Sequence, residues 1–132
     1  MKKVIVSCML LVLGLVAFSQ SASKIKSNSI QSKNIWVNKS ATDKYLESTE
    51  KYDVNGNLLE EIKYEEDKTI KSHKVWTYNA NNDKLTETEL DKDGNILKKT
   101  VYEYNGVLKI SKKEYNEKNK LVEWKTYTYE SK

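Results

Sequence analysis

A repeat of about 26 residues is the feature that most constrains how this chain can fold. Tyrosines recur at spacings of 26, 26 and 25 residues, at Tyr52, Tyr78, Tyr104 and Tyr129. Apolar residues follow the first three of them at nearly constant distance, at Ile70, Ile96 and Leu121. Such a period is typical of proteins that stack one supersecondary unit several times. We expect residues 44–132 to form one repeat domain.

Each unit is predicted to contain two β-strands joined by tight turns. Clusters rich in Asn, Asp and Gly recur at residues 53–57, 79–83, 91–95, 105–106 and 116–119. Asn and Gly tolerate the positive φ that tight hairpin turns demand. Side chains alternate with a period of two between the turns, and this close spacing of turns leaves no room for helices. The predicted fold is therefore all-β: an antiparallel meander of about seven strands forming a curled single sheet.

Residues 1–19 are typical of a cleaved export signal. Two lysines precede an apolar stretch at residues 4–18, and Ala17 and Ser19 supply the small side chains that a signal peptidase requires before a cut. An uncleaved N-terminal anchor is the alternative. With cleavage, the mature chain keeps no stable membrane span, and its predicted location is the periplasm or the cell exterior.

Residues 20–43 are rich in Ser, Asn and Lys and are predicted to be a polar N-terminal arm or linker. The cluster Asn34-Ile35-Trp36-Val37 is the one apolar part of this segment. It offers an additional edge strand to the repeat domain.

The composition argues against several classes of function. The net charge is +4 and all 23 basic residues are lysines, so the arginines that favour nucleic-acid contacts are missing. The chain has one His and one Cys, and that Cys lies in the export signal. A thiol- or zinc-based site is therefore not expected. We predict no nucleic-acid partner, no metal and no cofactor.

No motif for catalysis stands out either. Glu60 and Glu61 are adjacent on a predicted strand and point to opposite faces, so they cannot flank one glycosidic bond. The sequence at 91–95 looks like part of a calcium loop, but it lacks the further oxygens and the bidentate Glu of such a loop, and a hairpin turn explains it. His73 has no nucleophile in a constrained motif nearby, and we expect it beside Glu61. We predict that the protein is not an enzyme.

Folding the chain at each turn predicts cross-strand neighbours of opposite charge. The expected pairs are Glu60 with Lys74, Lys74 with Glu89, and Glu87 with Lys99. Such pairs contribute about 0.2–1 kcal/mol each. One hairpin departs from this rule, because its lysines are expected to face each other: Lys98 and Lys99 against Lys112 and Lys113.

Aromatic residues are the best binding candidates. Nine tyrosines and three tryptophans supply rigid amphipathic area suited to stacking on a sugar or a peptide. The alternative is that they fill the only core of the sheet, because tyrosines recur with the repeat. The residues proposed for binding are Trp76, Tyr78, Tyr102, Tyr104, Trp124 and Tyr127. A small basic patch for an anionic surface is proposed from Lys98, Lys99, Lys112 and Lys113, with ordinary solvated lysines as the alternative.

The unit Tyr52-Asp53-Val54-Asn55-Gly56-Asn57-Leu58 resembles the YD repeat of Rhs-type proteins. The strings at 93–96 and 104–108 look like degenerate copies. The same texture, over about residues 44–132, is similar to the MORN-like repeats of small bacterial antitoxin-type proteins. These resemblances imply β-hairpin architecture. The signal ending Phe18-Ser19-Gln20 is similar to those of exported proteins of Bacteroidetes-type bacteria.

The function expected from the sequence is surface interaction or a structural role by an exported repeat protein. The partner would be an as yet unidentified protein or glycan. The MORN-like resemblance implies an alternative, a periplasmic antitoxin or immunity protein that binds and blocks a toxin. Exposed sheet edges also offer a route to self-association or to strand addition by a partner.

Overall fold

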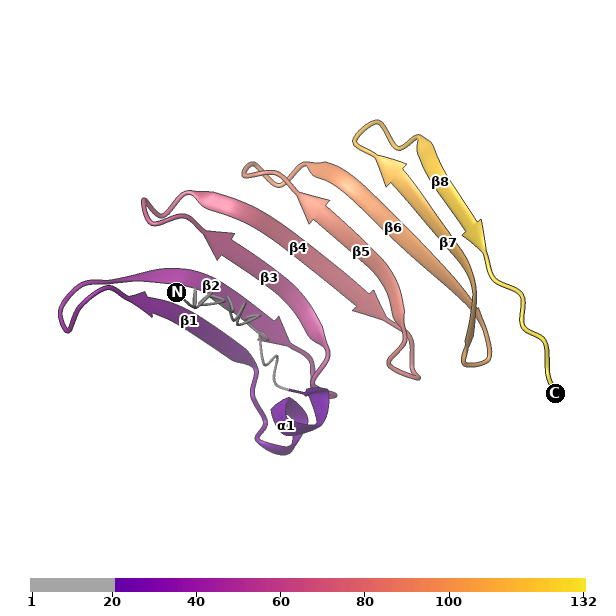
Figure 1. Cartoon of the computed structure of the whole chain (residues 1–132), viewed down its shortest axis with the longest axis horizontal. Helices are drawn as coiled ribbons and strands as arrows, with labels where there is room; N and C mark the ends of the chain where they lie inside the picture. Colours follow the sequence, from indigo (N-terminus) through magenta and orange to yellow (C-terminus); the bar gives the residue numbers. More distant parts are fainter. Residues whose placement is uncertain (1–20) are drawn as a thin grey trace, which may run out of the picture.

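The computed structural model of the chain describes residues 21–132 and forms one antiparallel sheet of eight strands (Figure 1). The strands lie side by side in the order of the sequence. Their bounds are β1 Ser32–Asn38, β2 Lys44–Tyr52, β3 Leu58–Tyr64, β4 Ile70–Tyr78, β5 Lys84–Leu90, β6 Ile96–Asn105, β7 Leu108–Asn116 and β8 Leu121–Thr126. The predicted all-β meander in a single sheet is confirmed. The predicted signal peptide, 1–19, lies outside the described residues.

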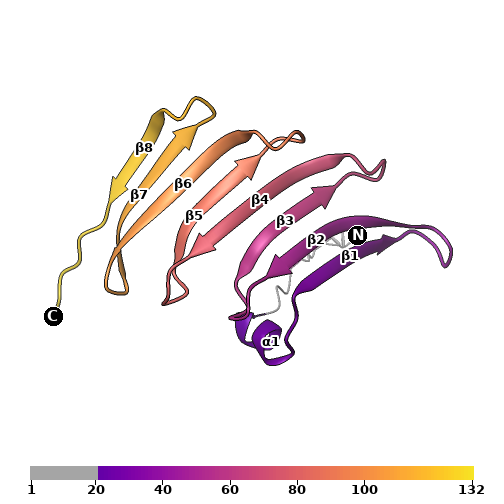
Figure 2. The ribbon, with the colours of Figure 1, turned by 180° about the vertical axis from the view of Figure 1, so that it is seen from behind.

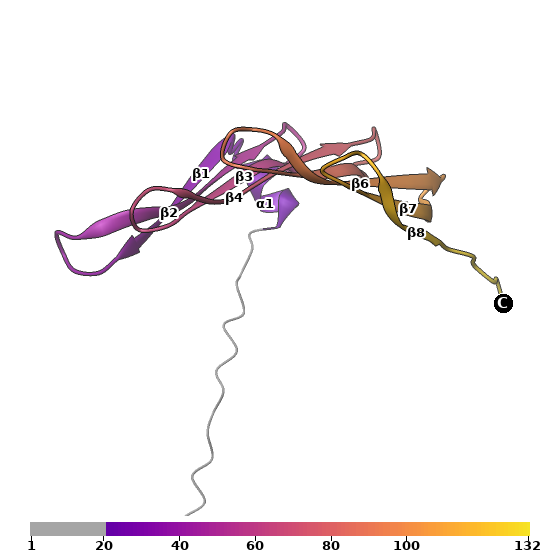
Figure 3. The ribbon, with the colours of Figure 1, turned by 90° about the horizontal axis from the view of Figure 1, so that it is seen from above.

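The sheet is a single curled layer, as the view from above shows (Figure 3), and residues 21–132 place no second layer over it in the view from behind (Figure 2). Ile25, 1% exposed, is the only buried hydrophobic residue in the described part of the chain. The other buried residues of the described chain are Gly56 in the 53–57 turn and four small polar residues near mid-strand: Ser48, Thr88, Thr100 and Ser111. The sheet is therefore held by ladder hydrogen bonds and cross-strand side-chain contacts rather than by an apolar core between layers.

The predicted polar arm contains two regular elements. Residues Ala22–Ser27 form a short helix, α1, and Ser32–Asn38 form β1, which includes the apolar cluster 34–37. β1 pairs antiparallel with β2, so the additional edge strand offered by that cluster is present. It brings the number of strands to eight. The sheet thus begins at Ser32, inside the segment that the composition sets apart as an arm.

Five of the turns have the same structure. In each, the backbone N–H of the first residue donates to the carbonyl of the fifth, and the N–H of the fourth donates to the carbonyl of the first; these turns are 53–57, 65–69, 79–83, 91–95 and 116–120. The fourth residue has positive φ in all five: Gly56, Lys68, Asn82, Gly94 and Asn119. In four of the turns an Asp or Asn at the first position also accepts two backbone N–H groups through Oδ1: Asp53, Asn79, Asp91 and Asn116. This side-chain bonding explains why Asn and Asp mark the turns in the sequence.

Every strand pair contains one β-bulge, and these bulges make the observed register differ from the predicted one. Each of the seven pairs has one register shift, in most cases beside the turn. The predicted pair of Lys74 with Glu89 is correct, but Glu60 lies opposite Val75 and Glu87 opposite Thr100. Counting back from a turn misses the extra residue that a bulge inserts, and the error is one position.

The register also divides the side chains between two faces, because paired residues point to the same side. The face that carries Tyr52, Tyr78 and Tyr104 is called the tyrosine face below. A row of mostly charged residues crosses it from β1 to β6: Lys33, Glu50, Glu61, Lys74, Glu89 and Lys98. The other side, called the opposite face, carries residues such as His73, Val75 and Trp124.

Candidate functional site

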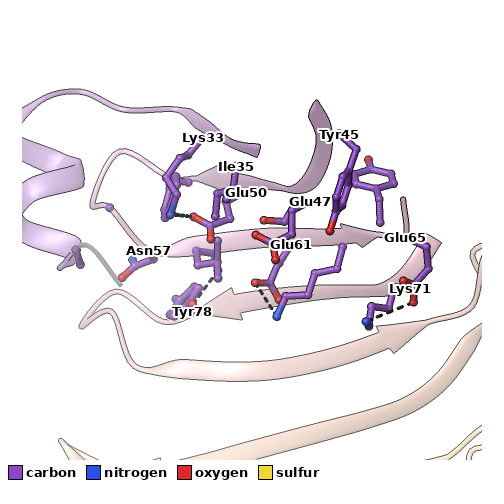
Figure 4. A pocket seen from close by; sticks show the side chains of 17 residues that line it. Lys33, Ile35, Tyr45, Glu47, Glu50, Asn57, Glu61, Glu65, Lys71 and Tyr78 are labelled. Atoms are coloured by element: carbon purple, nitrogen blue, oxygen red, sulfur yellow. Dashed lines mark hydrogen bonds and ion pairs between the residues drawn. The ribbon is translucent and has the colours of Figure 1, made fainter. Parts of the chain in front are cut away.

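The tyrosine face is hollowed over β1–β4 (Figure 4). The hollow has a volume of about 700 Å³ and its lining combines three kinds of side chain. The tyrosine rings on this face are those of Tyr45, Tyr52 and Tyr78; the glutamates are Glu47, Glu50, Glu61 and Glu65; the lysines are Lys33, Lys63 and Lys71. Rings for stacking thus stand beside carboxylate acceptors and ammonium donors, which is the chemistry that recognises a hydroxylated or polar ligand.

Ion pairs order the polar side chains of the hollow. Lys33 pairs with Glu50, and the Lys63 Nζ and Lys71 Nζ atoms each lie 3.4 Å from a carboxylate oxygen, of Glu61 and Glu65 respectively. The Tyr52 hydroxyl donates to the same Glu50 carboxylate. Burial, followed by this hydrogen bond, raises the pKa of Tyr52, so its hydroxyl stays a donor at neutral pH.

Three of the repeated tyrosines have an evident structural task. Each hydroxyl donates to a backbone carbonyl 20 residues earlier: Tyr78 to Leu58 at 2.8 Å, Tyr104 to Lys84 at 2.8 Å, and Tyr129 to Lys109 at 2.6 Å. The carbonyl belongs to the preceding odd-numbered strand in each case. The repeat of tyrosines along the sequence is thus a repeat of one hydrogen bond in the structure.

The six aromatic residues proposed for binding are not brought together. Trp76, Tyr78, Tyr102 and Tyr104 lie on the tyrosine face, and Tyr127 follows the end of β8. Trp124 pairs with Lys113 on the opposite face. Only Tyr78 lines the hollow. Trp76 and Trp124 therefore cannot contact the same small ligand.

All three tryptophans carry a lysine over the ring. The Nζ atom lies 4.8 Å from the ring centroid for Lys44 on Trp36, 5.7 Å for Lys84 on Trp76 and 5.3 Å for Lys113 on Trp124. Cation–π contacts of this kind contribute about 0.5–1 kcal/mol at exposed sites. A ligand that stacked on one of these rings would first displace the lysine.

The four lysines of the predicted basic patch are divided between the two faces. Lys98 and Lys112 lie on the tyrosine face, and Lys99 and Lys113 on the opposite face, because neighbours along a strand alternate. They do not face each other across the hairpin either: Lys98 lies opposite Asn116 and Lys99 opposite Tyr115.

Two of these lysines are also closely paired with glutamates. Lys112 lies 3.1 Å from a carboxylate oxygen of Glu123, and Lys113 lies 2.7 Å from one of Glu103. These hydrogen bonds raise the pKa of both lysines, against the opposing effect of burial. The lysines thus form ion-paired rows rather than a basic patch.

His73 lies on the opposite face, across from Ile62 rather than Glu61. Its Nε2 is 2.9 Å from a carboxylate oxygen of Glu60, which also pairs with Lys51. The hydrogen bond from Lys51 is the largest influence on the Glu60 carboxyl and lowers its pKa. Burial acts in the opposite direction, but the hydrogen bond with His73 adds to the effect of Lys51, and the pKa of Glu60 is lowered overall. The histidine thus belongs to a polar cluster on the side of the sheet away from the hollow.

Sequence reasoning missed most of the residues that line the hollow. Tyr52 and Tyr78 belong to the repeated tyrosines, but Tyr45 and Glu47 precede the first of these and no motif marks them. Between residues 21 and 132, no group of three or more His, Cys, Asp or Glu side chains is placed to hold a metal ion. In the same part of the chain, no helix is long and apolar enough to cross a membrane.

Comparison of the chain with protein-family models and with curated proteins finds no match.

Proposed function

We propose that the protein is an exported, non-enzymatic binding protein that holds a glycan or a protein segment against the hollow of its tyrosine face. The observation that carries this proposal is the lining of that hollow. Three tyrosine rings, of Tyr45, Tyr52 and Tyr78, stand beside side chains that both donate and accept hydrogen bonds. A ligand with alternating apolar and hydroxyl surfaces would match this mixture.

The openness of the sheet supports the same function. No second layer covers the tyrosine face (Figure 3), so a long ligand could extend from the hollow across the row of charged residues. The export signal predicted at 1–19 supports a location in the periplasm or outside the cell, where glycans and envelope proteins are available.

The test compares two aromatic residues on different faces. We expect Tyr45→Ala, in the hollow, to weaken retention of the ligand about tenfold, the usual effect of removing an aromatic hot spot. Trp124→Ala, on the opposite face, is the matched control and should bind as the unchanged chain does. The chain from Gln20 to Lys132 would be screened on a glycan array and by affinity capture from envelope fractions. Equal loss in both variants, or binding that survives Tyr45→Ala, would contradict a site in the hollow.

A second candidate function is immunity by toxin binding, which the MORN-like texture of residues 44–132 favours. In that case the hollow would hold a loop of the toxin instead of a glycan. The same capture experiment separates the two, because immunity predicts one protein retained at a fixed stoichiometry and no glycan signal.

A further inference from the structure

The two edges of the sheet leave backbone groups without partners. β1 and β8 each pair on one side only among the described residues, so their outer sides present N–H and C=O groups. The N–H of Tyr127 donates inward to the Ile110 carbonyl. Because backbone groups alternate in direction along a strand, the N–H groups of Trp124 and Thr126 point outward.

β8 occupies the position in its unit that β2, β4 and β6 occupy in theirs. The hydrogen bond from Tyr129 to the Lys109 carbonyl matches those of Tyr78 and Tyr104 in the units before it. β4 and β6 have a further strand beyond them, whereas the outer side of β8 is unpaired among residues 21–132. The edge at β8 is therefore built like the side of β4 or β6 that pairs with a further strand.

Exposure of the side chains supports this comparison. Tyr78 and Tyr104 are half-buried, but Tyr129 is 54% exposed although it makes the same hydrogen bond. Trp124 of β8 is 61% exposed. A strand added beside β8 would cover a surface that resembles the covered surfaces of the inner units.

β1 has the direction and the sequence to be that strand. The sheet has an even number of antiparallel strands, so β1 and β8 run in opposite directions. A second copy, displaced by the same step that relates the repeat units, would place its β1 antiparallel to β8 of the first. β1 also has apolar residues to offer, including Trp36, which is exposed.

The internal junctions fix the register of such a contact. In each internal junction, the residue two positions before the repeated tyrosine pairs with a residue of the next strand. That partner is Glu61 in the β2–β3 junction, Glu87 in the β4–β5 junction and Lys112 in the β6–β7 junction. Ile35 is the residue of β1 that corresponds to these three, and Tyr127 is the residue two positions before Tyr129. The corresponding contact would set Tyr127 against Ile35, and the next pair would be Thr126 against Trp36.

We propose that the chain self-associates head to tail, with β8 of one copy paired antiparallel to β1 of a second copy in this register. The contact is heterologous, because it joins two different edges. Each added copy leaves one free β8 and one free β1, so the assembly stays open and its eight-stranded sheets join into one continuous sheet. This proposal does not depend on the ligand of the hollow.

Two edge-blocking variants test the proposal. Thr126→Pro removes an outward N–H of β8. Asn34→Pro removes an outward N–H of β1. The Gln31 carbonyl accepts from the Tyr52 N–H and therefore points toward β2. Because backbone groups alternate along the strand, the Asn34 N–H points away from β2. Thr126→Lys and Asn34→Lys are the second pair of variants, in case proline perturbs the fold. Circular dichroism and the unfolding midpoint would show that each variant is folded.

Sedimentation velocity of the chain from Gln20 to Lys132 gives the result. We expect the average mass of the unchanged chain to rise continuously with concentration, and each folded variant alone to be monomeric. An equimolar mixture of the β8 and β1 variants should form a species of twice the monomer mass and nothing larger. The free β1 of one variant pairs with the free β8 of the other, and both outer edges of this dimer are blocked. A monomer at every concentration would overturn the proposal. So would association of either variant by itself, which would indicate pairing of like edges.

Discussion

The two ends of the sheet are finished in different ways. At the N-terminal end, α1 packs beside the 53–57 turn and buries Ile25, the one hydrophobic residue buried in the described chain. At the C-terminal end, residues 127–132 form no helix, and Trp124 is 61% exposed. Both ends are built on the same turns and the same strand pairing, so the cap is the main difference between them.

The comparison shows how a sheet without an apolar core distributes its stability. In a repeat protein each unit is stabilised mainly by its neighbours, and an end unit lacks one of them. α1 adds packing near the 53–57 turn, beside the ends of β1 and β2, while the outer side of β1 stays unpaired. Among residues 21–132 the last hairpin has no such packing, and we expect it to be the least stable part of the sheet.

The largest predicted effect comes from two equivalent glycines. Gly56 and Gly94 are the fourth residues of matching turns, with φ of 81° and 85°. A Cβ on Gly56 would lie 2.1 Å from the Ala22 carbonyl oxygen in α1, whereas a Cβ on Gly94 would meet nothing within 4 Å. Gly94→Ala should cost about 1 kcal/mol for the left-handed backbone. Gly56→Ala should cost about 3 kcal/mol, because it also displaces the helix that buries Ile25.

The measurement is the free energy of unfolding in urea, followed by circular dichroism. Gly94→Ala is the matched control, since it carries the same backbone penalty without the helix. Equal destabilisation by the two substitutions would show that α1 does not act as a cap.

The next effect tests the cap from the side of the helix. Ile25→Ala should lower the free energy of unfolding by about 2 kcal/mol, the low end for a buried isoleucine because the site opens at the surface. Leu121→Ala, at the exposed C-terminal edge, should cost well under 1 kcal/mol. A larger loss for Leu121→Ala than for Ile25→Ala in the same urea titration would reverse the comparison between the ends.

A smaller effect is expected from the repeated tyrosine hydrogen bond. Tyr78→Phe and Tyr104→Phe each remove a bond to a backbone carbonyl in a half-buried position and should cost about 1 kcal/mol. Tyr129→Phe should cost less, because its position is exposed and water can replace the hydroxyl. Thermal unfolding of the three variants measures the loss of stability for each. Equal losses would mean that the contribution of this hydrogen bond to stability does not depend on the position of the tyrosine in the sheet.

The smallest predicted effect is a loss of stability in acid. The side-chain amide of Asn95, followed by backbone N–H groups of the turn, lowers the pKa of Asp91. For Asp53, burial raises the pKa, but the combined hydrogen bonds from Asn57 and the turn amides lower it overall. Because both folded-state pKa values are depressed, their stabilisation is complete above the unfolded-state pKa of about 4 and is lost as the pH falls through the folded-state values.

Asparagine variants isolate this effect, because Asn79 already occupies the same position in a matching turn. Asp91→Asn and Asp53→Asn should keep the turn and show a shallower fall in unfolding midpoint below about pH 4. An unchanged slope in the double variant would assign the acid sensitivity to other carboxylates.

Much of the fold could be predicted from the sequence, because the turns carry their own chemistry. Asp53, Asn79, Asp91 and Asn116 mark turns by hydrogen bonding to the backbone, and a local pattern reveals them. The turn at 65–69 has Lys68 at the position of positive φ, where Gly or Asn is usual, and so its signal is weak. At 105–106 the signal is correct but shifted, since Asn105 pairs with Leu108 and the loop is Gly106-Val107.

The candidate site was less accessible to sequence reasoning. The hollow takes side chains from four strands, and which of them meet depends on the bulges beside the turns. Adjacent lysines such as Lys112 and Lys113 suggested a patch, although alternation along a strand separates them. Trp76 and Trp124 are binding candidates because their rings suit stacking, a property that says nothing about the face on which they lie.

Amide hydrogen exchange of the monomeric chain, in dilute solution, tests the difference between the two ends most directly. The account predicts that the β7–β8 hairpin exchanges first, while the β2–β3 hairpin beside α1 is protected nearly as well as the central strands. Gly56→Ala should remove that protection and leave the exchange of β7–β8 unchanged. Exchange from β2–β3 as fast as from β7–β8 in the unchanged chain would contradict the claim that α1 stabilises the N-terminal part of the sheet.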